Sequence, residues 1–409
     1  MEQLKVLHFG DLHARDADLE EIKKCAGKIV ETAYSEQPDL IIFSGDFFDS
    51  QFIRLDSESA RLVAYLFAEL AEVAPVVAPI GTPSHDGTAA TILGAIRAKH
   101  HIIVAARPCQ VYLWAGKDVY PDWMFSPAIP DAILSLIPTP TKQYLETQGT
   151  VSEGDEAIRN MMSSIFAGFG AQAAQWPGVP HILVGHYTTR GCKISEKQTL
   201  MGVDIEISYD QMQLARPSVC CLGHIHMHQQ IGENVFYSGS PYRCNWGEME
   251  DKGFYLHTLD GDRLINSEFI QTPARKLVRI DVDFTQYDGL DLADTNYSLP
   301  EDPEAIRGAS VRLIYKVYPD QVELIDKEQT KAFYLDEGAE SVEIRLLRQP
   351  RITVRNEKVL RAHRLRDKIV EMANGNGGEL PAGVLSKADA LDDFSPEAII
   401  ARIKEGAQL

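Results

Sequence analysis

Short apolar runs alternate with longer amphipathic stretches through the first half of the chain. Lys5–Phe9, Asp39–Asp46 and Pro75–Gly81 are apolar runs of the length that a buried strand requires. Between them, Leu19–Tyr34 and Ser57–Val73 place apolar residues at the spacing of a helix. This alternation of strand, helix and strand predicts a layered α/β domain.

Two later runs, His181–His186 and Ser218–His224, repeat the pattern of an apolar strand that ends in a polar residue. In layered α/β folds, functional side chains gather at the carboxyl ends of the strands. We therefore expect the polar residues that follow these five runs to share one site. They are Asp11, His13, Asp46, His85, His186, His224 and His226.

A second region begins near Arg275. Lys276–Phe284 alternates apolar and polar residues, as a half-exposed strand does. Residues 310–318 and 341–349 are predicted to be further strands, with a helical stretch at 321–329 between them. The pattern predicts a small α/β domain.

A third region follows Pro350. Asn356 is a suitable cap for a helix that runs to about Ala373, and Ser395 with Pro396 marks the start of a terminal helix. The stretch thus predicts a helical segment. The expected domains are 1–274, 275–349 and 350–409.

Composition adds limits to this picture. The chain has 409 residues, too many for one small core, and 44% of them are hydrophobic. It contains no apolar run of about 18 residues, and its start lacks the features of a signal peptide. We expect a cytoplasmic protein without a membrane span. The six cysteines form no Cys-x-x-Cys pair, which favours buried free thiols over a disulfide or zinc framework.

The net charge of −19 argues against a protein that coats nucleic acid through bulk charge. Residues 345–368 nevertheless carry nine Lys or Arg against Glu357 and Asp367, so this segment is +7 and the rest of the chain −26. Such a segment can meet phosphates or an acidic partner. A solvated helix face is the alternative.

Three short motifs carry candidate chemistry. A carboxylate and an imidazole two residues apart, Asp11 and His13, suit a divalent transition metal, although a helix-entry Asp beside a surface His has the same pattern. Asp46 could bridge two cations through its two oxygens, or simply lie in a turn. His224 and His226 follow a buried strand, where two imidazoles together are costly unless they bind something. A hydrogen-bonded core pair is the alternative there.

Taken together, D-x-H, G-D-x-x-D, H-D, G-H and G-H-x-H occur in this order, each at a strand end. The series resembles the calcineurin-like metallophosphoesterases, whose third motif is G-N-H-[ED]. Four of the five motifs match. The stretch Phe236–Phe254, with its Y-S-G-S-P, G-E and K-G elements, further resembles the SbcD nucleases.

This resemblance implies a layered metallophosphoesterase β-sandwich flanked by helices, a small α/β capping domain and a C-terminal helical segment. It implies two divalent metal ions, with manganese suited to the mixed oxygen and nitrogen donors. Asp11, His13, Asp46 and His226 would hold one ion, and Asp46 would bridge to a second, which Ser84, His186 and His224 complete. His85 would be the transition-state acid, oriented by Asp86.

The third motif departs from the family, since Gly81-Thr82-Pro83-Ser84-His85-Asp86 has two extra residues and places Ser84 where Asn is usual. A serine hydroxyl is a shorter and weaker ligand than that amide, so the affinity for the second metal comes into question.

The resemblance also implies function and partners: a 3′→5′ exonuclease on duplex DNA ends and an endonuclease on single strands, in double-strand-break repair. It implies a homodimer whose C-terminal helices dock on an SbcC-type SMC-like ATPase. Two alternatives stay open. The chain could be a DNA-end-binding scaffold with a weakened metal site, or a metallophosphoesterase that acts on a small phosphodiester.

Overall fold

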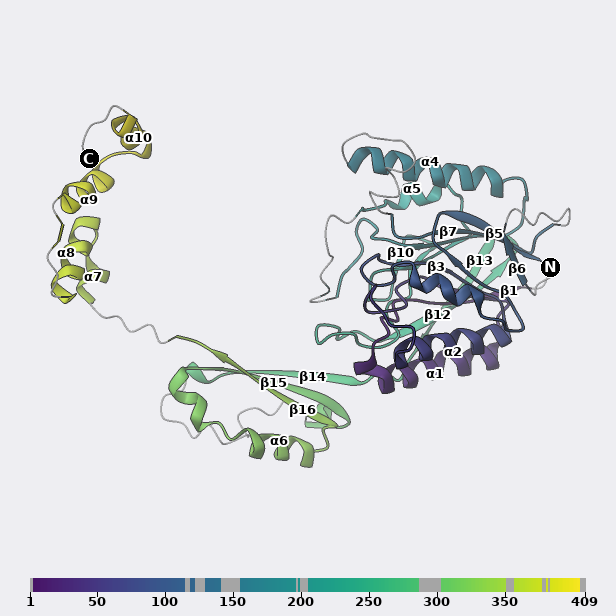
Figure 1. The fold of residues 1–409 in the computed structure, drawn as a ribbon, viewed down its shortest axis with the longest axis horizontal. Coiled ribbons are helices and arrows are strands. Elements are labelled where there is room, and N and C mark those ends of the chain that lie inside the picture. The colour runs from purple at the N-terminus through teal and green to yellow at the C-terminus, as the bar shows by residue number, and fades with distance from the viewer. Residues whose placement is uncertain are drawn as a thin grey trace. The chain divides into compact units, whose positions relative to one another are not determined.

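The computed structural model describes residues 3–114, 118–121, 129–140, 155–195, 198, 205–286, 303–350, 357–376, 380–381 and 383–404. The chain divides into two compact units (Figure 1). Unit 1 comprises Met1–Val278, Ala305–Val311 and Gly338–Ser341. Unit 2 comprises Arg279–Glu304, Arg312–Glu337 and Val342–Leu409.

Unit 1 contains a six-stranded sheet with the order β13-β12-β1-β2-β3-β4. Its first four strands along the chain are parallel, and β12 joins β1 in antiparallel register. The bounds are β1 (Leu4–Phe9), β2 (Leu40–Phe43), β3 (Val76–Pro79), β4 (Ile102–Ala105), β12 (Gly253–Asp260) and β13 (Arg263–Gln271). The first three strands are the three apolar runs that the sequence pattern predicts.

A seven-stranded sheet, with the order β10-β11-β9-β8-β7-β5-β6, faces the first. Its central strands β7, β8 and β9 are parallel, so their carboxyl ends meet at one edge. The bounds are β5 (Cys109–Trp114), β6 (Asp118–Pro121), β7 (Ala132–Ile137), β8 (His181–His186), β9 (Val219–Gly223), β10 (Gln229–Ile231) and β11 (Val235–Tyr237).

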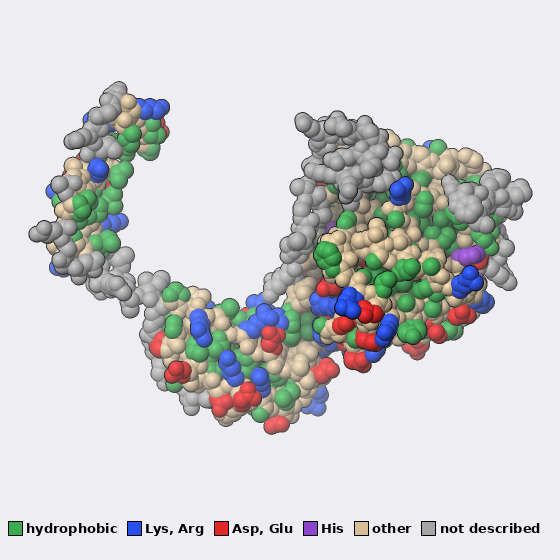
Figure 2. All heavy atoms as spheres, viewed as in Figure 1, with side chains coloured by type: hydrophobic (Ala, Val, Ile, Leu, Met, Phe, Trp, Pro, Cys, Tyr) green, Lys and Arg blue, Asp and Glu red, His purple; other side chains and the backbone are tan. Residues whose placement is uncertain are grey.

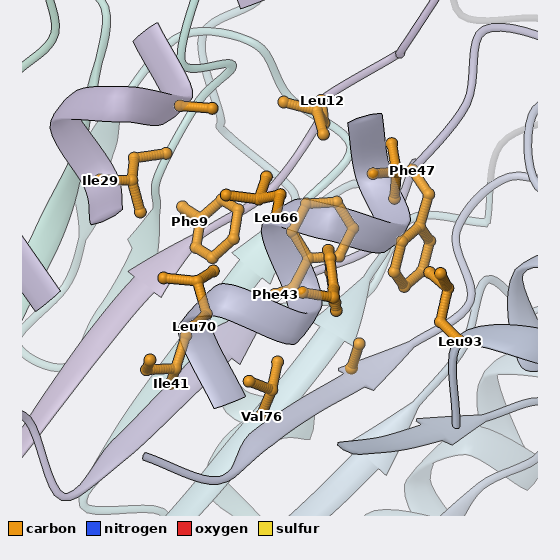
Figure 3. Packing of buried hydrophobic residues seen from close by; sticks show 14 of the residues in the cluster. Phe9, Leu12, Ile29, Ile41, Phe43, Phe47, Leu66, Leu70, Val76 and Leu93 are labelled. Atoms are coloured by element: carbon orange, nitrogen blue, oxygen red, sulfur yellow. The ribbon is translucent and has the colours of Figure 1, made fainter. Parts of the chain in front are cut away.

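Helices cover the outer face of each sheet (Figure 1). Helices α1 (Leu19–Glu36) and α2 (Glu58–Val73) pack on the six-stranded sheet through a core that includes Phe9, Phe43 and Leu66 (Figure 3). Ser57 caps α2, because its hydroxyl accepts a hydrogen bond from the Ala60 N–H at 3.2 Å.

Helices α4 (Asp155–Ala173) and α5 (Tyr209–Gln213) cover the other sheet through a separate apolar cluster. A third cluster fills the space between the sheets, with Val6 and Leu40 from one sheet meeting Leu134 and Val184 from the other. The predicted fold class, an α/β sandwich flanked by helices, is confirmed.

Unit 2 carries most of a smaller α/β assembly, whose three strands each begin within residues assigned to unit 1. A three-stranded sheet has the order β14 (Lys276–Asp283), β15 (Ala309–Val317) and β16 (Ser341–Arg348), with helix α6 (Lys327–Asp336) beside it. The helical stretch expected over 321–329 is partly wrong. A 3₁₀ helix covers Pro319–Leu324, and α6 begins only after Asp326, whose carboxylate accepts from the Gln329 N–H at 2.9 Å.

The C-terminal segment of unit 2 is helical, with α7 (Glu357–Arg361), α8 (Leu365–Asn376), α9 (Val384–Asp393) and α10 (Pro396–Lys404). The single helix predicted from Asn356 to Ala373 is wrong, and Asn356 itself lies outside the described residues. The helix is interrupted between Arg361 and Leu365. The N–H of Leu365 donates to the Asp392 carboxylate at 2.7 Å. A long-range cap from α9 thus decides where α8 begins.

Part of the predicted basic segment is neutralised locally. Arg364 forms an ion pair with Asp393 at 2.7 Å, and Arg366 pairs with Asp389. These contacts join α8 to α9. Arg351 and Arg355 lie outside the described residues.

None of the helices within the described ranges has the length and apolar character that crossing a membrane requires. All six cysteines are free thiols, of which Cys25, Cys220 and Cys221 are buried.

Candidate metal centre

The residues at the carboxyl ends of the parallel strands adopt an unusual backbone. Asp11, His13, Asp46 and His224 have φ angles of 52°, 40°, 59° and 90°, in the left-handed region that disfavours residues with a Cβ atom. Conformations of this kind cost about 1–3 kcal/mol each and concentrate at functional sites. The surrounding fold therefore forces these side chains into position.

One group of donors combines Asp11, His13 and His226, whose ligand atoms lie within 4.8 Å of one another. The Nε2 atoms of His13 and His226 are 2.9 Å apart. Asp11 is fully buried, and its Oδ1 accepts from the His224 N–H at 2.8 Å. Its Oδ2 is buried with no hydrogen-bond partner among the described residues, as expected for an oxygen reserved for a cation.

A second group combines Asp46, His186 and His224 within the same distance limit. Asp46 Oδ2 lies 3.1 Å from His186 Nε2 and 3.5 Å from His13 Nε2. One carboxylate oxygen therefore faces both groups, as a bridging ligand would. We call the two groups together, with Thr82 described below, the strand-end cluster.

Hydrogen bonds fix the tautomers of two of these histidines. The Nδ1–H of His186 donates to the Ser44 carbonyl at 2.7 Å, and the Nδ1–H of His226 donates to Glu248 at 2.8 Å. Both rings thus turn Nε2 toward the cluster. A carbonyl or carboxylate behind the ring is the usual support of a metal-binding imidazole.

The carboxylates also set the protonation of these rings in the metal-free protein. Burial alone lowers the pKa of His186, but the charge and hydrogen bond of Asp46 raise it to about 9. Burial likewise opposes protonation of His226, yet hydrogen bonds to Cys244 and Glu248 raise its pKa well above the ordinary value. A cation that enters the cluster must displace these protons.

A buried ion pair supports His226 from behind. Glu248 is fully buried and lies 2.7 Å from the Nζ atom of Lys252, which also donates to the Ser240 hydroxyl and the His226 carbonyl. Against the effect of burial, His226 and Lys252 hold the pKa of Glu248 at about 2. Glu248 therefore stays ionised and keeps the ring of His226 in place.

The loop after β3 corrects one expectation. Ser84 is exposed, and its carbonyl accepts from the Gln51 N–H at 2.9 Å. The hydroxyl that faces the cluster belongs to Thr82, which lies 3.2 Å from Asp46 Oδ2, 3.3 Å from His186 Nε2 and 3.5 Å from His224 Nδ1. Ser84 is thus not the residue beside the second group of donors; Thr82 is.

The family motif predicts that Asp86 orients His85. In the structure the Asp86 side chain has other partners instead. Its buried carboxylate accepts four backbone N–H groups, from Asp46, Phe47, Phe48 and Gly81, at 2.7–3.2 Å. It therefore ties the loop after β2 to the loop after β3.

The His85 ring instead donates its Nδ1–H to the Asp49 carbonyl at 3.0 Å. It stands edge-on to His13, with the ring centroids 4.6 Å apart. His85 thus lies at the rim of the strand-end cluster, partly open to solvent.

Two glycines of the motifs are required by close packing. A Cβ atom on Gly81 would lie 2.2 Å from the Asp46 nitrogen, and one on Gly45 would lie 2.5 Å from His186 Nδ1. Gly45 also has a φ of 98°. Larger residues here would displace the backbone and carboxylate of Asp46 or the ring of His186.

The structure brings together six of the predicted ligands: Asp11, His13, Asp46, His186, His224 and His226. Their oxygen and nitrogen donors fit divalent transition metals. The sequence reasoning missed Thr82, Glu248 and Lys252. Thr82 follows Gly81 directly, as Asn follows Gly in the family motif, so reading the motif forward from the glycine would have found it.

Comparison with known proteins finds similarity to a family of phosphoesterases. Residues 4–81, which include Asp11, His13 and Asp46, match the calcineurin-like phosphoesterase family. The SbcD subunit of the nuclease SbcCD from Staphylococcus epidermidis is 21% identical over 291 residues, which cover 69% of this chain and 73% of that protein.

Two solved structures are also similar. GAP50, the anchor in the inner membrane complex of Plasmodium, gives a TM-score of 0.44 at 13% identity and covers 66% of this chain and 85% of its own. A dimetal phosphatase from Danio rerio gives 0.40 at 12% identity and covers 66% and 99%.

Proposed function

We propose that this chain, whose residues 4–81 match the calcineurin-like phosphoesterases, is a metal-dependent DNA nuclease of the SbcD type. The reaction is hydrolysis of a phosphodiester, as a 3′→5′ exonuclease on duplex ends and an endonuclease on single strands. The observation that carries the proposal is the position of Asp46 Oδ2 between His13 and His186. One oxygen within reach of both groups of donors is what a two-metal site requires.

Each half of the strand-end cluster would hold one divalent cation. Asp11, His13, Asp46 and His226 form one ligand set, and Asp46, Thr82, His186 and His224 the other. When bound, the two ions lower the pKa of a water molecule and offset the charge of the phosphodiester. The oxygen and nitrogen donors suit Mn²⁺.

The side chains of the site have separate roles. Asp46 connects the two halves of the strand-end cluster through one carboxylate oxygen. Glu248 and Ser44 keep the Nε2 atoms of His226 and His186 turned inward. His85, at the rim of the cluster, stabilises or protonates the leaving 3′-oxygen.

A role in double-strand-break repair with an SbcC-type ATPase rests on the relative, whose name marks it as one component of SbcCD. The C-terminal helices support it, because apolar and basic side chains intermingle on their surface (Figure 2). Met372, Leu391 and Ile403 are each more than half exposed. We propose that these side chains dock on the ATPase. The homodimer and the cytoplasmic location stay predictions.

A cavity beside the cluster favours hydrolysis of small phosphodiesters as a second candidate. It encloses about 370 Å³ and is lined mainly by apolar groups, including Ile80, Pro83, Pro108, Ile137 and Met162. A single nucleoside could occupy such a space. The scaffold alternative has less support, because it rested on Ser84 and the hydroxyl of Thr82 faces the cluster instead.

The first experiment is incubation of the full chain with end-labelled linear duplex DNA and Mn²⁺. We expect cleavage by the wild type and by Asp56→Asn, a control acid that is exposed and paired with Arg54. Asp46→Ala should retain the fold and lose cleavage. Hydrolysis of nucleotides without cleavage of DNA would favour the second candidate, and DNA retention without cleavage in the wild type would restore the scaffold.

A further inference from the structure

Three metal-ligating side chains lie together between the two sheets of unit 1, apart from the strand-end cluster. His8 comes from β1 and His257 from β12, both in the six-stranded sheet, whereas Cys221 comes from β9 in the seven-stranded sheet. One donor atom of each lies within 4.8 Å of the other two. All three side chains are fully buried. We call them the sealed cluster.

Apolar and aromatic residues surround the sealed cluster. Cys221 belongs to the same buried group as Val6, Phe236 and Tyr255. The ring of His257 stacks on Tyr255, with the centroids 5.5 Å apart and the planes at 11°. Two imidazoles and a thiol at the centre of an apolar layer are costly to bury unless every polar atom has a partner.

Hydrogen bonds among the described residues satisfy this group only in part. His257 Nδ1 contacts the Ser267 hydroxyl at 2.8 Å, so its Nε2 is left to face His8 Nδ1 at 3.3 Å. His8 Nε2 is buried without a hydrogen bond of good geometry among the described residues, and the backbone of Leu222 is the polar group that acts on this ring. A nitrogen separation near 3.3 Å fits one N–H···N hydrogen bond. It equally fits two nitrogens that share an ion, since bond lengths of about 2.0–2.1 Å place such ligands ~3.4 Å apart.

The chemical state of the two rings also suits a cation. Burial lowers the pKa of His257 to about 3 and that of His8 well below its ordinary value. Both imidazoles are therefore neutral at pH 7 and offer lone pairs. The Ser267 contact behind His257 is the kind of support that orients a metal-binding ring.

We propose that His8, Cys221 and His257 form a second metal site, sealed between the sheets, for a thiophilic cation, Cu⁺ or Zn²⁺. Two nitrogens and one sulfur are the donors that such ions prefer. Binding exchanges the thiol proton of Cys221 for a sulfur–metal bond, and the proton leaves to solvent. Charge and ligand number favour Cu⁺, because one thiolate neutralises it, whereas Zn²⁺ would leave a net positive charge and usually takes four ligands.

The sealed site would tie together the two sheets through bonds between β1, β12 and β9. It does not depend on the proposed nuclease activity, since none of its residues belongs to the strand-end cluster. Its role is structural, because the cluster is closed to solvent and leaves no place for a substrate.

The test compares Cys221→Ser with Cys220→Ser in the full chain, produced without a metal-affinity tag. Cys220 is the matched control because it is equally buried on the same strand but faces α4 and α5. Each protein is refolded with Cu⁺ under reducing conditions or, in a parallel arm, with Zn²⁺, and retained metal is counted after competition with a chelator. We expect the wild type and Cys220→Ser to retain one Cu⁺ that Cys221→Ser binds at least tenfold more weakly.

The arms distinguish the two ions. Retention of one Zn²⁺ that depends on Cys221 supports the site and assigns it to zinc. Equal retention of both metals by wild type and Cys221→Ser overturns the proposal. If Cys221→Ser does not fold, the wild type decides alone: the thermal unfolding midpoint must rise with the metal, together with thiolate-to-metal absorption in the ultraviolet, and the absence of both overturns it.

Discussion

The strand-end cluster and the sealed cluster are both rich in buried histidines, yet His186 and His226 at the strand ends differ from His8 and His257 in the direction of their pKa shifts. At the strand ends, Asp46 raises the pKa of His186, and hydrogen bonds to Cys244 and Glu248 raise that of His226. Between the sheets, burial lowers the pKa of both His8 and His257, and for His8 the neighbouring His257 adds to the effect. Burial is similar in the two places. At His186 the carboxylate of Asp46 outweighs burial and raises the pKa, whereas at His13 burial outweighs the same carboxylate and lowers the pKa.

The strongest way to break this contrast is to neutralise Asp46. Asp46→Asn keeps the shape of the side chain but removes the charge that raises the pKa of His186. We expect that pKa to fall from about 9 to below its ordinary value, as in the sealed cluster, and DNA cleavage to drop to background. An NMR titration of the ring and a cleavage assay check both results. An unchanged pKa would show that Asp46 is not the cause.

The pH dependence of metal binding tests the raised pKa of His186 in the wild-type protein. Below a pKa of about 9, His186 is protonated in the metal-free protein, so a cation that binds the group of Asp46, His186 and His224 must displace one proton from that ring. Affinity should rise about tenfold per pH unit, ~10³-fold from pH 6 to 9, and then level off. Metal titrations across this range provide the measurement. A flat profile would contradict the assigned protonation of the ring.

His85→Ala separates acid catalysis from metal binding. His85 lies at the rim and donates to the Asp49 carbonyl, so its loss should leave the bound metal unchanged. Turnover should fall at least about 10²-fold, the usual contribution of a general acid. Metal analysis beside steady-state cleavage rates gives the answer. A variant that also lost its metal would show that His85 is a ligand.

Glu248→Gln tests the support behind His226. The amide keeps the size but weakens the hydrogen bond at 2.8 Å that turns Nε2 toward the cluster. We expect metal affinity to fall about 10–100-fold, with the protein still folded. Isothermal titration with Mn²⁺ gives the affinity and circular dichroism the fold. If the affinity for Mn²⁺ is unchanged and only the stability of the fold decreases, Glu248 contributes to packing and not to metal binding.

The smallest expected effect concerns the loop after β3. Thr82→Ala removes the hydroxyl beside Asp46, His186 and His224, whereas Ser84→Ala changes an exposed side chain two residues away. We expect the second metal to bind roughly tenfold more weakly in Thr82→Ala, comparable to the loss of supporting contacts at metal sites, and as in wild type in Ser84→Ala. Isothermal titration of both variants with Mn²⁺ makes the comparison. The reverse result would reinstate Ser84.

Sequence reasoning reached the parts of the site that follow local rules. Apolar strands that end in Asp or His identified Asp11, Asp46 and His186, because parallel strands bring their carboxyl ends to one edge. The hydroxyl residue in the loop after β3 was not identified correctly. Because this loop has two extra residues, the family motif can be aligned on Gly81, which selects Thr82, or on His85, which selects Ser84. The role of Asp86 in joining two loops was not predicted either, because its four hydrogen bonds depend on how those separate loops pack.

The sealed cluster could not be found in this way. His8 and His257 become neighbours only through the antiparallel register of β1 and β12, which pairs His8 with Tyr255. Cys221 joins them from the opposite sheet. The break before α8 has a similar origin, because Asp392 lies far along the chain from Leu365. Contacts of this range follow from tertiary packing, not from local pattern.

The left-handed backbone of Asp11, His13, Asp46 and His224 has a consequence for the evolution of this fold. Glycine is the residue that these positions favour, and each such replacement would relieve about 1–3 kcal/mol of strain. Glycine would also remove side-chain hydrogen bonds such as those of Asp11 and Asp46. If the proposed hydrolysis were no longer selected, glycine would be favoured at the positions where relief of strain exceeds that loss.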